Sequence, residues 1–306
     1  MSDIKLFKVN NGTAQELQGT SIAIEKTLQT MIENQLEVFL GVRFLASEYS
    51  TGKTHGGRID TLGIDEDGSP VIIEYKRAVN ENVINQGLFY LDWLMDHKGE
   101  FELHVLKKLG KEAADSIDWS APRLLCIASD FTKYDEYAVQ QINRNIELMR
   151  YRRYGTELIL FELVNATTAQ EQTVTTSENG SKHKGVAVSK TATKMLEQAP
   201  PDIQNRFESL KAFLLALGDD VQMKVLKQYF AFRRIKNFAC VEILPQTRKI
   251  IIWVKVDPSS IQLEKGFTRD VHDIGHYGTG DLEITIQNDD DLKRAEVLLL
   301  KSYEVS

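Results

Sequence analysis

The sequence predicts an α/β fold: a mixed β-sheet flanked by helices in residues 1–165, a polar linker over 166–193, and a smaller α+β domain over 194–306. Three observations support this division. In the first part, strand-like apolar runs alternate with stretches that carry apolar residues at helical spacing, which is typical of a sheet covered by helices. The linker is rich in Thr, Ser, Gln, Glu, Asn and Lys and has few large apolar residues. With 306 residues, the chain is long enough for two domains.

The elements of the first domain follow from periodicity and turn signals. The clearest is a β-hairpin, because the Asp-Gly turn within residues 65–68 separates two apolar runs, 61–64 and 70–73. Residues 1–20 are expected to contain a short strand and a polar turn. Other expected strands are 43–49, 123–128 and 158–163. Expected helices are the amphipathic stretches 24–36, 83–94 and 134–149.

The second domain begins with an amphipathic helix over 203–217, which Gly218 ends. Expected strands follow at 227–232, 238–243, 250–255 and 282–286, and a closing helix at 291–303. The phrase 271–281 contains two histidines and two aspartates, but its glycines suit a tight loop before the next strand. We therefore expect this loop to have a structural or substrate-contact role rather than a catalytic one.

Composition limits the classes of protein that the chain can belong to. It is 42% hydrophobic and 26% charged, which is a globular balance. No apolar run approaches the length of a membrane span, the first residues carry no secretory signal, and the two cysteines lie in different halves, so we expect a cytoplasmic protein without disulfides or zinc. The net charge of −7 argues against a surface that binds nucleic acid throughout, but it leaves room for a local basic groove.

The hairpin carries the residues with the clearest chemical potential. Asp60 stands at the start of its first strand, and Glu74 stands near the end of the second, where the two come side by side. Strand alternation puts Lys76 on the same face as Glu74, and Tyr75 on the other. As a bare spacing of Asp, Glu and Lys, this pattern is more often an ordinary charged hairpin edge than an active site.

Two acids at this position suit magnesium. Mg²⁺ prefers carboxylate and carbonyl oxygens and keeps several waters, so Asp60, Glu74 and the main-chain carbonyl of Tyr75 are sufficient ligands. A bound metal ion and an activated water are what phosphodiester hydrolysis requires, and Lys76 would stabilise the charge that develops on the phosphate.

Two predicted helices surround the hairpin in the chain. Gln86 and Tyr90 are four residues apart and project from one face of the later helix. The earlier helix carries Glu25 near its start. Glu33 is the second choice for the acid that this helix contributes to the site, and Glu37 also lies in the region. Glu48 is a further candidate, but it is better interpreted as a charge at the edge of a strand.

This ordered set of residues resembles the PD-(D/E)xK nuclease superfamily, and within it the NucS-like endonucleases, over residues 20–165. The resemblance rests on the helical acid, the phrase 57–60, the triplet 74–76 and the Gln86/Tyr90 helix. It implies a restriction-endonuclease-like fold and a Mg²⁺- or Mn²⁺-dependent endonuclease. It also implies Glu25, Asp60 and Glu74 as metal ligands, Lys76 as catalytic, and Gln86 and Tyr90 as supporting residues.

The chain departs from the family pattern at two positions. Ile59 replaces the proline before the first acid, and the aromatic Tyr75 stands where an aliphatic residue is usual. Neither side chain is expected to touch the metal. The C-terminal segment resembles an uncharacterised domain found at the end of such nuclease-like chains, from which no activity can be transferred.

DNA is the expected partner, and a homodimer that cuts two strands is the expected assembly. Arginines with interleaved tyrosines in 144–154 suit contacts to the phosphate backbone and base stacking, but they equally suit a helix end with capping arginines. The alternative function is a non-catalytic nucleic-acid-binding or regulatory protein that keeps the nuclease fold. The candidate nucleic-acid-binding residues are Arg58, Arg77, Arg144, Arg150, Arg152 and Arg153.

Overall fold

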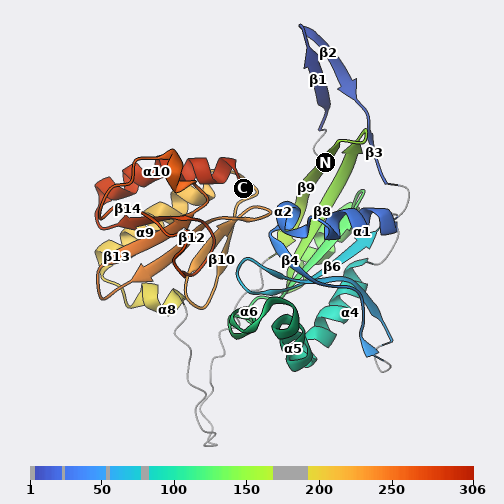
Figure 1. Cartoon of the computed structure of the whole chain (residues 1–306), viewed down its shortest axis with the longest axis horizontal. Helices are drawn as coiled ribbons and strands as arrows, with labels where there is room; N and C mark the ends of the chain where they lie inside the picture. Colours follow the sequence, from blue (N-terminus) through green and yellow to red (C-terminus); the bar gives the residue numbers. More distant parts are fainter. Residues whose placement is uncertain (1–3, 23–24, 53–55, 77–82, 168–191) are drawn as a thin grey trace, which may run out of the picture. The chain divides into compact units, whose positions relative to one another are not determined.

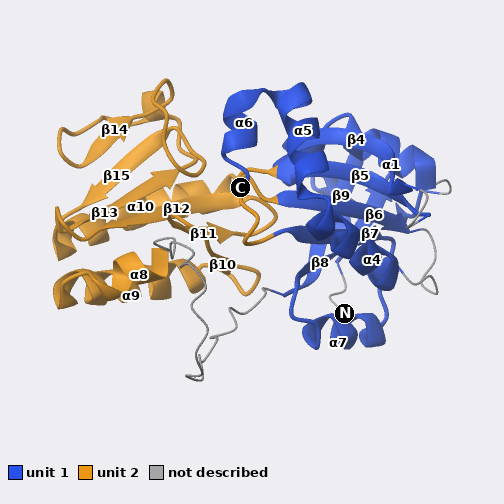
Figure 2. Cartoon of the chain, turned by 90° about the horizontal axis from the view of Figure 1, so that it is seen from below, with its two compact units in different colours: residues 1–64, 70–117, 122–169 blue, residues 65–69, 118–121, 170–306 orange. Residues whose placement is uncertain are grey.

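The computed structural model describes residues 4–22, 25–52, 56–76, 83–167 and 192–306. These residues form two compact units, shown in different colours in Figure 2. The first unit consists of residues 1–64, 70–117 and 122–169, and the second of 65–69, 118–121 and 170–306. Residues 168–191 lie outside the described part, and they include most of the predicted linker.

The first unit is built on a seven-stranded mixed sheet in the order β3-β8-β7-β6-β5-β4, with β9 paired to β8. Strand β6 is antiparallel to β5 and parallel to β7, which is itself parallel to β8. The predicted α/β class is therefore confirmed. The strands are β3 (Gly19–Thr20), β4 (Val42–Ser50), β5 (Arg58–Asp65), β6 (Pro70–Lys76), β7 (Arg123–Ala128), β8 (Asn145–Tyr154) and β9 (Leu158–Thr167), and β1 (Leu6–Asn10) and β2 (Thr13–Leu17) form a separate hairpin.

Helices cover both faces of this sheet. Helix α1 (Glu25–Glu33) and helix α4 (Val83–Asp96) lie on opposite faces, as Figures 1 and 2 show. Gly87 lets α4 approach β7 closely, because a Cβ atom at this position would lie 2.4 Å from Leu124 Cδ1. The other helices of this unit are α2 (Leu36–Leu40), α5 (Lys98–Leu109), α6 (Lys111–Asp115) and α7 (Lys133–Gln140).

Two predicted helices differ from those observed. The helix expected over 24–36 ends at Glu33, and the short helix α2 begins at Leu36, after Gln35, whose φ is −138°. The helix expected over 134–149 ends at Gln140, and Asn145–Tyr154 is the strand β8. In β8, apolar and charged residues alternate on either side of Leu148 and Met149, where two apolar residues adjoin and the pairing with β9 shifts register.

The second unit is an antiparallel six-stranded sheet in the order β10-β11-β12-β13-β15-β14. Its helices pack on one face, where their apolar side chains form the main core with those of the strands. A smaller buried cluster that includes Tyr229, Cys240 and Trp253 fills the other face. The elements are α8 (Ala192–Glu197), α9 (Pro201–Leu215), β10 (Gln222–Val225), β11 (Phe230–Arg233), β12 (Asn237–Leu244), β13 (Lys249–Val254), the 3₁₀ helix η1 (Pro258–Ser260), β14 (Thr268–Asp270), β15 (Leu282–Ile286) and α10 (Asp289–Glu304).

Replacing Gly280 with alanine should destabilise the second unit by about 3 kcal/mol. Gly280 has a φ of +122°, and a Cβ atom there would lie 2.4 Å from the main-chain carbonyl of Val254. Urea unfolding measures the change. Gly275→Ala in the same loop is the control, because nothing lies within 4 Å of its Cβ position. Equal stability of the two variants would contradict a role of Gly280 in close packing.

Among the described helices, none combines the length and the apolar character needed to cross a bilayer.

Candidate active site

The β5–β6 hairpin brings the two strand acids together, as its predicted register requires. Thr61 is paired with Ile73, which places Asp60 opposite Glu74. The main-chain N–H of Asp60 donates to Glu74 Oε1 at 3.2 Å, and the N–H of Tyr75 donates to Asp60 Oδ2 at 3.0 Å. Each strand therefore orients the carboxylate of the other.

Burial makes this pair costly to ionise. It raises the pKa of Asp60 to about 6, and the carboxylates of Glu25 and Glu48 act in the same direction. Burial, and then the neighbouring Asp60 carboxylate, raise the pKa of Glu74 to about 9. Glu74 is fully buried, and its Oε2 atom has no hydrogen-bond partner.

Lys76 and Glu25 both act electrostatically on the two acids. The charge of Lys76 lowers the pKa of each acid, and the charge of Glu25 raises it, although burial is the largest influence on both. Glu25 begins helix α1. Glu33, the second choice for the helical acid, accepts hydrogen bonds from Thr61 Oγ1 at 2.6 Å and from Gln29 Nε2 at 3.0 Å. These contacts explain Glu33 as a structural residue and favour Glu25 as the acid of the site.

Tyr75 packs on the other face of the strand. Its side chain is fully buried, and its hydroxyl lies within hydrogen-bonding distance of Thr61 Oγ1, at 3.3 Å. The predicted orientation, away from Glu74, is confirmed.

Tyr90 and Gln86 lie beside the start of β5. Gln86 Nε2 donates to the Tyr90 hydroxyl at 3.1 Å, and that oxygen also accepts the main-chain N–H of Arg58 at 3.1 Å. Both side chains line a cavity of about 640 Å³, which opens next to Asp60. The other lining residues are Ser50, Gly52, Gly56, Gly57 and Arg58.

Gly57→Ala should distort this cavity and destabilise the first unit by about 1–3 kcal/mol. A Cβ atom at Gly57 would lie 2.4 Å from Tyr90 Cε1, so the ring would have to move and its hydrogen bond to Arg58 would weaken. Denaturant unfolding measures the loss. Gly99→Ala is the control, because nothing lies within 4 Å of that Cβ position, and a similar loss in both variants would contradict the packing argument.

The candidate nucleic-acid-binding arginines have different environments. Arg58 is exposed and forms an ion pair with Glu48 at 2.6 Å. Arg144 and Arg152 are exposed, and Arg153 is half-buried. Arg77 lies outside the described residues.

The environment of Arg150 does not suit its predicted role as a nucleic-acid-binding residue. Its side chain is only 5% exposed and contacts Asp130 at 2.9 Å and Glu162 at 3.0 Å. A guanidinium that is buried and paired with two carboxylates is not placed to contact a phosphate, so we do not carry Arg150 into the nucleic-acid surface.

Sequence reasoning missed two residues that support the site. Gln29 is buried in α1, and its Nε2 donates to the main-chain carbonyl of Asp60 at 2.7 Å. Thr51 accepts the N–H of Gly57 on its Oγ1 at 2.9 Å, which fixes the glycine segment beside the cavity. A polar residue on the apolar face of a predicted helix was the available signal for Gln29.

Asp60 and Glu74 are suited to bind a divalent cation that keeps part of its hydration shell. In the described part of the chain, no three His, Cys, Asp or Glu side chains are grouped closely enough to hold a metal ion. Mg²⁺ differs from ions bound in all-protein cages, because one or two carboxylates with waters can hold it. The unpartnered Glu74 Oε2 and the adjacent Asp60 carboxylate supply the required oxygens.

Comparisons with known proteins give partial likenesses. Residues 192–306 match the family described as "Domain of unknown function (DUF5655)". An uncharacterized protein of Haemophilus influenzae is 28% identical over 292 residues, which are 93% of this chain and 94% of that protein.

Two solved structures of nucleases are similar in part. A repair endonuclease from Pyrococcus abyssi matches 43% of this chain and 48% of its own length, with 19% identity and a TM-score of 0.28. The protein in an EndoMS–double-stranded DNA complex matches 43% of this chain and 47% of its own length, with 18% identity and a TM-score of 0.25. This chain thus spans about half the length of each. At these TM-scores, the activity of this chain has to be argued from its own site.

Proposed function

We propose that this protein is a metal-dependent endonuclease that hydrolyses phosphodiester bonds of DNA at Asp60, Glu74 and Lys76. One observation carries the proposal. The side chains of Asp60 and Glu74 lie side by side on the paired strands β5 and β6, and Glu74 Oε2 has no hydrogen-bond partner. Burial raises the pKa of Glu74 to about 9, so without a counter-charge this acid is protonated at neutral pH. A divalent cation between the two acids would favour its ionised form.

A bound Mg²⁺ or Mn²⁺ would polarise the phosphate and lower the pKa of a bound water. Asp60 and Glu74 would hold the ion, with Glu25 as a further acid near them. Lys76 carries the positive charge that acts on both acids, and it would stabilise the negative charge that builds on the phosphate oxygens. Gln86 and Tyr90 fix the start of β5, and with it the position of Asp60.

The cavity beside Asp60 supports a phosphate-containing substrate. Three glycines line it, so a polyanion can approach the main chain closely, and the exposed side chain of Arg58 stands at its border. Arg144, Arg152 and Arg153 are the remaining candidates for contacts to the backbone of DNA. Such contacts carry no sequence information, and their contribution falls with salt.

The test is cleavage of circular substrates by the purified chain. Circular single-stranded DNA, circular double-stranded DNA and an RNA of similar length are each incubated with Mg²⁺, with Mn²⁺ or with EDTA. We expect nicking or linearisation of DNA with either metal and none with EDTA. Cleavage that persists in Asp60→Ala would remove the assignment of this site, and cleavage of RNA alone would replace DNA as the substrate.

A further inference from the structure

The turn that joins the two strands of the site belongs to the second unit. Residues 65–69, together with 118–121, cluster with residues 170–306, whereas the strands on either side of the turn belong to the first unit. The turn holds its own shape: Asp65 Oδ1 accepts the N–H groups of Asp67 at 3.0 Å and Ser69 at 2.8 Å. Gly68 has a φ of +78°, a conformation that suits glycine.

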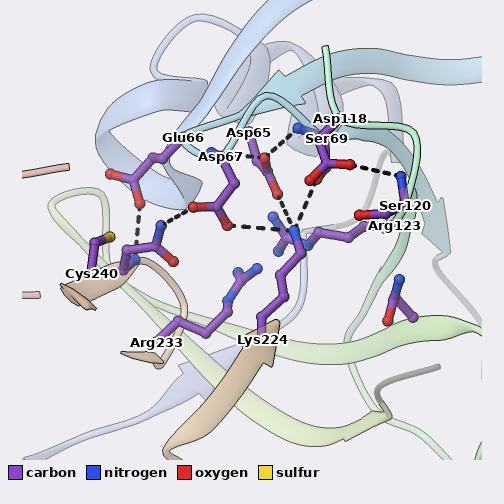
Figure 3. Close-up of polar contacts among 12 residues, drawn as sticks. Asp65, Glu66, Asp67, Ser69, Asp118, Ser120, Arg123, Lys224, Arg233 and Cys240 are labelled. Atoms are coloured by element: carbon purple, nitrogen blue, oxygen red, sulfur yellow. Dashed lines mark hydrogen bonds and ion pairs between the residues drawn. The ribbon is translucent and has the colours of Figure 1, made fainter. Parts of the chain in front are cut away.

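Lys224, on β10, is the centre of the polar contacts around this turn (Figure 3). Its Nζ lies 3.3 Å from Asp65 Oδ2, 3.4 Å from Asp67 Oδ2 and 3.0 Å from Ser69 Oγ. The side chains of Lys224, Asp65 and Asp67 are 7%, 4% and 1% exposed, so water does not screen these pairs.

Other side chains of the second unit complete the contacts to the turn. Tyr229 Oη and Asn237 Nδ2 donate to Asp67 Oδ1 at 2.8 Å and 2.6 Å. Glu66 receives Lys255 Nζ at 2.6 Å on one oxygen and the N–H of Asn237 at 2.9 Å on the other. All three acids of the turn therefore have partners within residues 224–255.

Replacing a buried lysine that has these partners should lower the free energy of unfolding substantially. Loss of its charge leaves Asp65 and Asp67 buried without a counter-charge, and breaking such a pair typically costs about 3–5 kcal/mol. The turn would then shift to reach water. Because the period of a strand is two residues, a shift of pairing by one residue turns every side chain of a hairpin strand to the opposite face.

We infer that Lys224 is a positioning residue for the Asp60–Glu74 pair, acting through the turn that joins β5 to β6. Asp60 and Asp65 lie on β5, and Glu74 lies on β6, which begins directly after Ser69. A turn that is held in place keeps Asp60 opposite Glu74. For activity, this inference rests on the proposed function; for the geometry of the hairpin, it does not.

The experiment compares Lys224→Met with Arg206→Met in the full-length protein. Arg206 is a matched control, because it is also buried in the second unit but pairs with Asp289, at 2.9 Å, instead of with the turn. Amide hydrogen exchange is measured at the N–H groups of Asp60 and Tyr75, which donate to the two acids of the site. We expect exchange at both amides to become at least ten-fold faster in Lys224→Met and to change less than two-fold in Arg206→Met.

Asp67→Asn is the second variant, in case Lys224→Met does not fold. It keeps the acceptor for Tyr229 and Asn237, and it replaces the charged oxygen that faces Lys224 with an amide NH2, which cannot accept from the lysine. We expect the same faster exchange at Asp60 and Tyr75 and a higher Mg²⁺ concentration for half-maximal cleavage. Wild-type exchange at these amides in a folded Lys224→Met or Asp67→Asn protein, or equal acceleration in Arg206→Met, would overturn the inference.

The two proposals fail in different ways. If the wild-type protein cleaves DNA and the Lys224 and Asp67 variants do so unchanged, with unchanged exchange at Asp60 and Tyr75, the positioning role is wrong and the proposed function stands. If exchange responds as expected but no variant and no wild-type protein cleaves any nucleic acid, the positioning role stands and the proposed function is wrong.

Discussion

Replacing Lys76 with alanine should reduce metal-dependent cleavage of DNA by about a thousand-fold, and replacing Asp60 with alanine should do the same. Lys76 supplies the positive charge that acts on both acids, and Asp60 is one of the two carboxylates that would hold the metal. A loss of this size corresponds to about 4 kcal/mol of transition-state stabilisation. Initial rates of plasmid nicking at saturating Mn²⁺ measure it.

Asp92→Ala is the control for this prediction, because Asp92 is an exposed acid on α4, in the same unit as the site. Its rate should stay within two-fold of the wild-type rate. Circular dichroism and thermal unfolding establish that each variant is folded. If Lys76→Ala is folded and keeps its rate, lysine takes no part in the reaction, and the site must be reassigned.

The metal-free protein should lose stability as pH rises, and Glu74→Gln should remove most of that loss. The folded-state pKa of Glu74 is about 9, and that of Asp60 is about 6, both above the ordinary values of these acids. The folded state therefore binds protons more tightly than the unfolded state does. The resulting stability is fully present below about pH 4 and is lost as pH rises towards 9.

The size of this effect follows from the shift of Glu74. Between pH 5 and pH 8.5, the wild type should lose roughly 3–5 kcal/mol relative to Glu74→Gln, at about 1.4 kcal/mol for each unit of pKa. Urea unfolding at both pH values in EDTA measures the difference. Mg²⁺ at pH 8.5 should restore stability to the wild type and not to Glu74→Gln, since a ligand that binds only the folded state stabilises it. Parallel pH profiles of the two proteins would show that Glu74 is not the group responsible.

The fold was predictable where local signals and burial agree. The Asp-Gly turn between two apolar runs placed the hairpin correctly, and apolar spacing placed α4 and α9. The error at 134–149 arose because Asn145–Tyr154 is buried in the sheet between β7 and β9. Its alternation of apolar and charged residues is broken between Leu148 and Met149, where the register with β9 shifts, and the pairing with distant strands identifies the segment as one strand.

The candidate site was predictable to the extent that it lies on one hairpin. Asp60 and Glu74 meet because of a short-range register, which the sequence contains. Gln29, in a helix that is distant in the chain, donates a hydrogen bond to the main-chain carbonyl of Asp60. Arg150 is buried because it pairs with acids from two other segments. Contacts of this kind depend on tertiary packing, so no local pattern predicts them.

The acids of the turn between β5 and β6 are synthesised before the residues of the second unit that contact them. Lys224 follows Asp65 by 159 residues, so a ribosome that adds about 5–20 residues per second makes the lysine roughly 8–30 seconds after the aspartate. During that interval, the turn carries three acids without the lysines and the tyrosine that later contact it. A growing chain would thus lack the partners of this turn until β10 and the residues after it have been synthesised. Premature termination anywhere before β10 would leave a first unit whose turn lacks its partners.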